Sequence, residues 1–337
     1  MKRKVIILCI IAIGTLLFAI AIGGVNVAPM EIIRIILNRT LGIGNVDDIS
    51  AANSAIIWNL RLPRALLAFV VGGMLSVSGA IMQSTLRNPL ASPFTMGVSS
   101  GASLGAALVI FSGIAFLPML TLPTAGFVMG MATMVVAMFL ASRIDGMMEN
   151  NTIVLMGMVI SLFINALTML LMALQREFMQ QIIIWQMGSV AMRDWPPIAI
   201  LAPVLALGLF IALRYHREMD IMTFGEDTAK TLGVNLKRVK WTLLLTAALL
   251  SGSAISFVGI IGFVELIAPH IVRRIFGARH SLVIPLSAMM GGTIMVLADL
   301  VARTIMRPEE LPIGIITALI GAPFFAYIYF AKRKETA

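Results

Sequence analysis

Long apolar runs recur along this chain, and they constrain its fold more than any other feature. Hydrophobic residues make up 59% of the 337 residues, whereas charged residues make up 12%. A soluble domain is about one quarter charged, and a membrane-spanning helix needs about 20 mostly apolar residues. A soluble fold would leave much of this apolar surface uncovered. The pattern therefore predicts an all-α membrane protein, with residues 1–337 forming a single transmembrane domain embedded in a lipid bilayer.

The apolar runs divide into about ten candidate spans, separated by polar or glycine-rich segments. The seventh and eighth runs allow two interpretations, because only a glycine-rich break at residues 259–262 interrupts the chain between Trp241 and Phe276. From this stretch alone, one long span and two short spans are both open. The candidate spans are residues 5–25, 62–85, 95–117, 119–142, 152–174, 196–214, 241–258, 260–276, 283–302 and 312–331.

Basic clusters lie at both ends of the chain, at residues 2–4 and 332–334. Because cytoplasmic flanks are enriched in Lys and Arg, both termini are predicted to be cytoplasmic, and the number of crossings is then even. Ten spans satisfy this condition, and the seventh and eighth runs are then separate. The net charge of +9 is explained by such loop anchors, so nucleic-acid binding is not predicted.

Motifs for nucleotide binding and hydrolysis are absent from the sequence. It contains no Gly-x-x-x-x-Gly-Lys-Ser/Thr, no His-Glu-x-x-His and no Gly-x-Ser-x-Gly, so the chain lacks the common cradle for ATP phosphates. Its three histidines, His216, His270 and His280, are far apart in the sequence. We therefore expect a transport protein that has no enzyme activity, cofactor or metal site of its own.

A polar island at residues 225–234 interrupts the apolar pattern. Its sequence is Gly-Glu-Asp-Thr-Ala-Lys-Thr-Leu-Gly-Val, and it lies within a polar segment of about residues 215–240 between the sixth and seventh spans. Such a segment must lie in water, and small residues and glycines at both ends favour an ordered turn. The island is therefore predicted to be a cytoplasmic docking surface.

Charged residues inside membrane spans are candidates for function. Asp299 and Arg303 are four residues apart, share one helical face and are predicted to form a structural ion pair. Glu265, followed by Pro269 and His270, is a candidate for a gate or for the translocation pathway. A carboxyl group that is hydrogen-bonded to unwound backbone is the equally plausible alternative for Glu265.

Arginines also gather at the predicted outer ends of two spans. Arg61 and Arg64 share a face at the mouth of the second span, and Arg303 ends the ninth. Unpaired basic groups there could bind an anionic substrate or acidic side chains of a partner. Interfacial anchors with snorkelling side chains are the alternative. Between the first two spans, apolar and charged residues alternate at helical spacing over residues 30–37, which predicts an amphipathic helix that lies along the outer membrane interface.

Several short motifs, each weak alone, occur in a specific order and spacing. Together they make the chain resemble the FecCD-type permeases, the membrane subunits of ABC importers for iron–siderophores, haem and cobalamin. The resemblance extends from about Leu60 to Phe330. The motifs are Arg61-Leu62-Pro63-Arg64, Arg87-Asn88-Pro89-Leu90-Ala91-Ser92-Pro93, Gly97-Val98-Ser99-Ser100-Gly101-Ala102, Gly225-Glu226-Asp227, Leu232-Gly233-Val234, Gly262-Phe263-Val264, Pro269-His270, Glu310-Leu311-Pro312-Ile313-Gly314 and Thr317-Ala318-Leu319-Ile320-Gly321-Ala322-Pro323-Phe324-Phe325.

The resemblance implies a type II ABC importer permease-like fold in a bacterial or archaeal cytoplasmic membrane. The chain would pair with a second permease, identical or closely related, around a central pathway. Cytoplasmic ABC ATPase subunits would hydrolyse ATP, and an extracytoplasmic substrate-binding protein would deliver an iron–siderophore-type chelate. Haem and cobalamin are the alternative cargoes.

The resemblance also assigns roles to residues. The island would form short coupling helices that fit a groove on the ATPase. Arg61, Arg64 and Arg303 would pair with glutamates on the binding protein. The residues assigned to ATPase coupling are Gly225, Glu226, Asp227, Ala229, Leu232 and Gly233.

The sequence departs from the family pattern at two positions. Glu265 stands where the family usually has glycine, and Arg279 stands where an acidic residue often precedes the histidine. A carboxyl group added to the eighth span could alter the gate or the cargo. It also motivates an alternative of another class, an ion-coupled secondary transporter that needs no ATPase.

Overall fold

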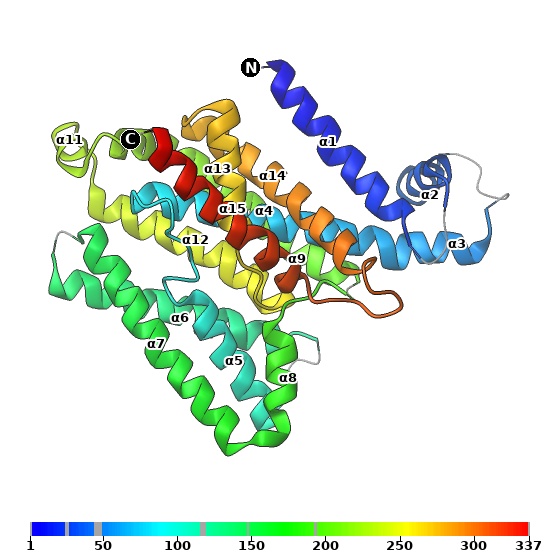
Figure 1. Cartoon of the computed structure of the whole chain (residues 1–337), viewed down its shortest axis with the longest axis horizontal. Helices are drawn as coiled ribbons and strands as arrows, with labels where there is room; N and C mark the ends of the chain where they lie inside the picture. Colours follow the sequence, from blue (N-terminus) through cyan, green and yellow to red (C-terminus); the bar gives the residue numbers. More distant parts are fainter. Residues whose placement is uncertain are drawn as a thin grey trace.

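The computed structural model describes residues 2–23, 27–43, 49–114, 119–146, 148–191 and 194–335, and over these residues it contains helices and connecting turns but no strand (Figure 1). Seven helical stretches are long and apolar enough to cross a membrane. They are α1 (Lys2–Ala21), α3 with α4 (Ala51–Thr85), α6 (Thr121–Ile144), α7 (Asn150–Leu174), α9 (Trp195–Arg214), α12 (Leu236–Val258) and α14 (His280–Ala302).

Three further helices occupy the remaining predicted spans. They are the shorter α5 (Val98–Ser112) and α13 (Val264–Phe276), and α15 (Ile313–Glu335). The break between α12 and α13 confirms that the seventh and eighth spans are separate. Gly259 and Phe263 both adopt positive φ angles in this break, which a continuous helix does not allow. The polytopic all-α fold that the apolar pattern predicts is therefore present.

The second helical stretch begins earlier than predicted. It starts at α3 (Ala51–Ile56), passes through a π-helical turn (Ile57–Arg61) and continues as α4 (Leu62–Thr85). A π-turn inserts an extra residue into the helix and rotates the side chains that follow. This turn ends at Arg61, the first of the three predicted arginines.

Two further helices lie outside the spans. The predicted amphipathic helix is α2 (Pro29–Leu41), whose Ile32 and Ile35 are fully buried. The second, α8 (Arg176–Gln186), was not predicted, because its sequence is short and mixes polar with apolar residues. Both follow a membrane helix directly and shape the connection to the next one.

Helix α4 forms the centre of the bundle and packs against α14, α12, α13 and α9. Glycines bring its backbone very close to its neighbours: a Cβ atom at Gly72 would overlap the carbonyl of Gly291 on α14, and one at Gly79 would overlap the carbonyl of Glu265 on α13. Small residues allow such close helix packing in lipid. Helices α5 to α8 form a second group beside this centre (Figure 1).

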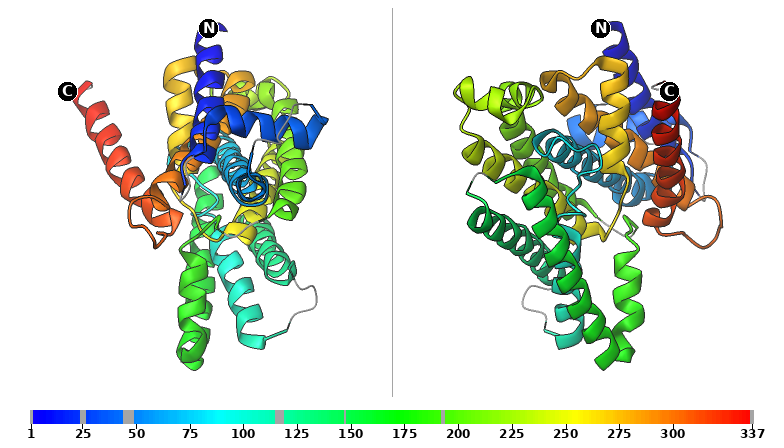
Figure 2. Two further views of the ribbon diagram at one scale, coloured as in Figure 1. Left: turned by 90° about the vertical axis from the view of Figure 1, so that its right-hand side faces the viewer. Right: turned by 60° about the vertical axis from the view of Figure 1, so that its left-hand side comes forward.

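The bundle has two distinct ends. At one end, the Lys4 ammonium donates to the carbonyl of Ile275 at 3.2 Å, which joins the start of α1 to the end of α13. Both chain termini lie toward this end (Figure 2), which we call the N-terminal face. The opposite end holds Arg61, Arg64 and Arg303, and we call it the arginine face.

Candidate functional site

The polar island folds as a compact helical turn on the N-terminal face. Helix α10 (His216–Met222) leads to α11 (Glu226–Thr231), and Asp220 of α10 bonds to His280 at the start of α14. Gly225 (φ 122°) and Gly233 (φ 82°) adopt backbone angles on either side of α11 that favour glycine. These two glycines therefore set the shape of the segment.

The residues predicted for coupling divide between an exposed and a buried side. Ala229 is fully buried, so it fastens α11 to the bundle. The Asp227 side chain is 99% exposed and Leu232 is 63% exposed. Phe224, which sequence reasoning missed, is 78% exposed. Phe224, Asp227 and Leu232 are thus exposed on this segment, where Phe224 and Asp227 line one groove and Leu232 lines another.

Glu226 points inward rather than toward solvent. Its carboxylate accepts from the ammonium of Lys240 on α12 at 2.8 Å, and the same ammonium donates to the carbonyl of Met148 at 2.6 Å. The Lys240 side chain is fully buried, and that of Glu226 is 19% exposed. A buried ammonium requires partners of this kind. Glu226 therefore ties α11 to α12 and to the connection between α6 and α7.

A groove of about 500 Å³ runs beside α11. Three separate connections of the chain meet there, since Arg87 follows α4, Glu149 precedes α7, and Asp227 belongs to the island, which Phe224 directly precedes. Arg87 begins the asparagine- and proline-rich turn of the family motif. Residues from three connections therefore line one polar groove on the N-terminal face.

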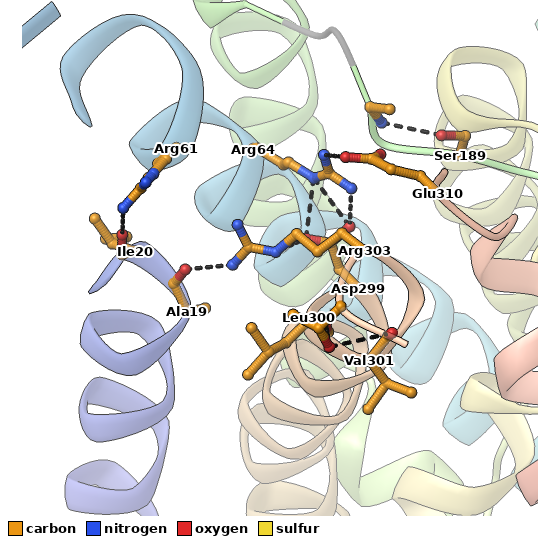
Figure 3. Close-up of polar contacts among 12 residues, drawn as sticks. Ala19, Ile20, Arg61, Arg64, Ser189, Asp299, Leu300, Val301, Arg303 and Glu310 are labelled. Carbon is orange, nitrogen blue, oxygen red and sulfur yellow. Dashed lines mark hydrogen bonds and ion pairs between the residues drawn. The ribbon is translucent and has the colours of Figure 1, made fainter. Parts of the chain in front are cut away.

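On the arginine face, Arg64 is committed to two carboxylates (Figure 3). Its guanidinium lies 2.8 Å from an oxygen of Asp299 on α14 and 2.9 Å from one of Glu310. The Asp299 side chain is 3% exposed and that of Glu310 is 41% exposed. The buried pair joins α4 to α14.

The other two arginines bind the end of α1. Arg61 is 8% exposed and donates to the carbonyls of Ile20 and Ala21 at 3.1 Å, while Arg303 donates to the carbonyl of Ala19 (Figure 3). The sequence suggested unpaired arginines at an outer mouth. That premise is wrong for Arg61, Arg64 and Arg303, because each satisfies a neighbouring helix end or a buried carboxylate within the chain.

The predicted ion pair between Asp299 and Arg303 is present but secondary. Arg303 Nε lies 3.7 Å from Asp299 Oδ2, whereas Arg64 makes three shorter hydrogen bonds to the same carboxylate. Helical spacing predicts the pair within α14, but the stronger partner comes from α4, which is 235 residues away in the sequence.

The predicted gate residues lie on α13, away from both faces. Glu265 is 2% exposed, and its Oε2 has no hydrogen-bond partner in the described part of the chain. His270 packs edge-on against Phe324 and Phe325 of α15 at 6.3 and 6.5 Å between ring centroids. Glu265 thus lies at the buried start of α13, and its two interpretations, a gate residue and a carboxyl held by unwound backbone, both stay predictions.

No group of three His, Cys, Asp or Glu side chains that could hold a metal ion occurs within the described residues.

Comparisons with known proteins agree with this architecture. The model of the FecCD transport family matches residues 8–331. The chain is 39% identical to the ABC transporter permease protein YvrB of Bacillus subtilis, covering 95% of this chain and 91% of that protein. It is 34% identical to the Fe(3+)-citrate import system permease protein YfmE of the same organism, over 98% and 96%.

A solved structure is also similar over nearly its whole length. It is described as an inward-facing conformation of a metal-chelate type ABC transporter, and it superposes with a TM-score of 0.85 at 30% identity, covering 98% of this chain and 100% of that one. The chain therefore belongs to the FecCD transport family.

Proposed function

We propose that this chain is the membrane-spanning permease subunit of an ABC importer that moves an iron–siderophore-type chelate across a bacterial or archaeal cytoplasmic membrane. Relatives named for import of Fe(3+)-citrate, iron(3+)-hydroxamate, hemin and cobalamin support this class of cargo. Haem and cobalamin are the alternative cargoes. ATP hydrolysis belongs to separate ATPase subunits, since the sequence has no phosphate-binding loop.

The observation that carries this proposal is the exposed surface of Phe224, Asp227 and Leu232 on the N-terminal face. Large apolar groups exposed within a polar segment mark a site of contact with another protein. The buried side of the same segment is fixed by Ala229 and Glu226. A protruding segment that is fixed to the bundle in this way could fit a groove on the ATPase and transmit the conformational change of the ATPase to the permease.

The test compares two apolar-to-acidic variants in capture of the ATPase subunit of the same transport system. Leu232→Glu should lower the affinity for the ATPase by about 30-fold, which equals ~2 kcal/mol. Ile305→Glu is the matched control, because Ile305 is 62% exposed at the opposite face. Capture that is unaffected by Leu232→Glu, or equally lowered by both changes, would overturn the assignment.

Docking of an extracytoplasmic binding protein is proposed for the arginine face. Arg61, Arg64 and Arg303 hold the ends of α1, α4 and α14 together there, and the exposed Glu310 and Arg307 surround them. Arg64→Glu should abolish docking of the binding protein while ATPase capture persists. Adding Asp299→Arg restores an internal pair. If docking returns in the double variant, Arg64 acts inside the chain; if it does not, Arg64 contacts the partner.

We further propose that both termini and the island face the cytoplasm and that a second permease, identical or closely related, completes the pathway. Abundant Lys and Arg on the N-terminal face support this orientation. A cysteine placed at the exposed Thr228, in a Cys9→Ser background, should react with an impermeant maleimide only from the cytoplasmic side. Labelling from outside would contradict the orientation and the coupling role together.

The ion-coupled alternative depends on Glu265, whose carboxyl is enclosed at the start of α13. Glu265→Gly should therefore leave ATP-dependent uptake largely intact. Proton-driven uptake in vesicles without any ATPase would favour the alternative instead.

A further inference from the structure

A second polar network, separate from the Glu226–Lys240 tie, joins the island segment to the bundle. Asp220 lies on α10, and one of its carboxylate oxygens is 2.6 Å from His280 Nδ1 and 3.0 Å from the His280 backbone nitrogen. His280 Nε2 lies 2.6 Å from the hydroxyl of Ser84 on α4. The same hydroxyl is 3.1 Å from Arg273 on α13. Four helices thus meet through three side-chain contacts in series.

The donors and acceptors of this network run in one direction. A guanidinium only donates and a carboxylate only accepts, so Arg273 donates to Ser84 and His280 Nδ1–H donates to Asp220. Ser84 is then free to donate to the remaining ring nitrogen of a neutral His280. Every contact is satisfied in this arrangement, and Asp220 also caps the first turn of α14, which lacks a cap from its own chain neighbour.

The centre of the network is buried, whereas the Asp220 side chain at its outer end is 34% exposed. His280 is 2% exposed and Ser84 is 7% exposed. Arg273 also donates to Gln83 on α4 and to the carbonyl of Ala80 at 3.3 Å. Hydrogen bonds in such surroundings are stronger than in water. Movement of α10 away from α14 would break both bonds between Asp220 and His280, while the remaining bonds hold α4, α13 and α14 to one another.

We propose that Asp220, His280, Ser84 and Arg273 form the interlock through which the island segment and the helices α4, α13 and α14 move as one body. Asp220 is a positioning residue that has no need to touch the ATPase. The Glu226–Lys240 tie holds α11 to α12, whereas the interlock extends the connection to the centre of the bundle. This inference rests on the proposed function, because it concerns the same coupling segment.

The test measures communication between the two faces, without knowledge of the cargo. The permease is reconstituted in liposomes with its ATPase, and ATP hydrolysis is recorded with and without the binding protein. If the two faces are coupled, binding of the partner at the arginine face should change the rate of ATP hydrolysis by the subunit bound at the N-terminal face. Asp220→Asn keeps the shape of the side chain but weakens its bonds to His280. It should reduce stimulation by the binding protein about tenfold, with ATPase capture and melting temperature unchanged.

Two further variants separate transmission from folding. Glu218→Gln is the matched control, since it makes the same carboxyl-to-amide change on α10 outside the interlock, and it should retain stimulation. Ser84→Ala, on α4, should reduce stimulation as Asp220→Asn does, and the double variant should be no worse than either single one, because both break the same series of bonds.

The outcomes are distinct. Unchanged stimulation in Asp220→Asn, additive losses in the double variant, or loss of ATPase capture in Asp220→Asn would overturn the interlock. Failure of the wild-type permease to capture any ATPase would instead overturn the proposed function.

Discussion

Similar charged residues have different structural roles on the two faces of this molecule. On the arginine face, Arg61, Arg64 and Arg303 all turn inward and fasten α1, α4 and α14 to one another. On the N-terminal face, Lys240 and Glu226 are equally internal, yet they hold up a segment whose other side is exposed. A charge in a polar segment can therefore serve as support for a docking surface rather than as part of it.

This difference separates two kinds of residue within a single motif. Glu226 and Asp227 are neighbours in the sequence, but the side chain of Glu226 is 19% exposed and that of Asp227 is 99% exposed. Their substitution should therefore affect different measurements. The predictions below test this contrast, beginning with the largest expected effect.

Removal of Glu226 should cost the most stability. Glu226→Leu leaves the fully buried Lys240 ammonium without its carboxylate, and loss of one partner from a buried ion pair costs about 3–5 kcal/mol. The double change Glu226→Leu with Lys240→Met should recover most of that loss, because a buried pair can be replaced by apolar groups. Thermal unfolding in detergent measures both, and equal losses in the single and double variants would contradict the buried-pair interpretation.

On the arginine face, two carboxylates that differ in burial bind the same guanidinium, that of Arg64, so the effects of removing them can be compared. Asp299→Ala removes the buried partner of Arg64 and should cost about 1.5–3 kcal/mol, as expected for a hydrogen-bonded charged group. Glu310→Ala removes the partially exposed partner and should cost at most about 1 kcal/mol. If the two losses were equal in an unfolding assay, burial would not be what distinguishes these carboxylates.

The turn before α11 should be sensitive to any side chain. Gly225 has φ 122° and ψ 153°, a region that is accessible essentially only to glycine, so Gly225→Ala should cost about 1–3 kcal/mol. Space does not limit this substitution, since the nearest atom to an added Cβ would be 3.8 Å away. Gly262→Ala is the control, because Gly262 has open space and is not among the positive-φ glycines. Unfolding data that do not separate the two variants would count against a conformational role for Gly225.

The smallest effect on stability is expected at Asp227. Its side chain is exposed, and its ion pair with Lys230 is long, at 3.5 Å, so Asp227→Ala should leave the melting temperature unchanged. The same variant should weaken ATPase capture, because the carboxylate belongs to the proposed docking surface. A large loss of stability with normal capture would reverse the assignment of Glu226 and Asp227.

Much of the fold was accessible from the sequence because the bilayer fixes the length of a span. The apolar runs predict the membrane helices, and the even number of crossings required by the basic clusters at both ends predicts the separation of α12 from α13. The glycines at 225 and 233 mark the limits of the island correctly. The positions of the helix ends were less accurate, since the second helical stretch begins at Ala51 rather than near residue 62.

The partners of the charged residues could not be predicted in the same way. Arg64 meets Asp299 from 235 residues away, and Lys240 meets the carbonyl of Met148 from 92 residues away. The local periodicity of the sequence cannot identify these long-range partners, because the contacts depend on which helix ends lie together in the fold. Sequence spacing therefore identified the weaker Asp299–Arg303 pair and missed Lys240, Asp220 and Arg273.

The glycine contacts of α4 restrict how this chain can change shape. The backbones of α4 and α14 are in direct contact at Gly72 and Gly291. Because no side chains separate the two helices there, they should move together as a rigid pair. Helix α15 has far fewer neighbours and diverges from the rest (Figure 2). We therefore expect the pathway to open and close by a movement of α15 relative to the rigid α4–α14 pair, and not by bending of that pair.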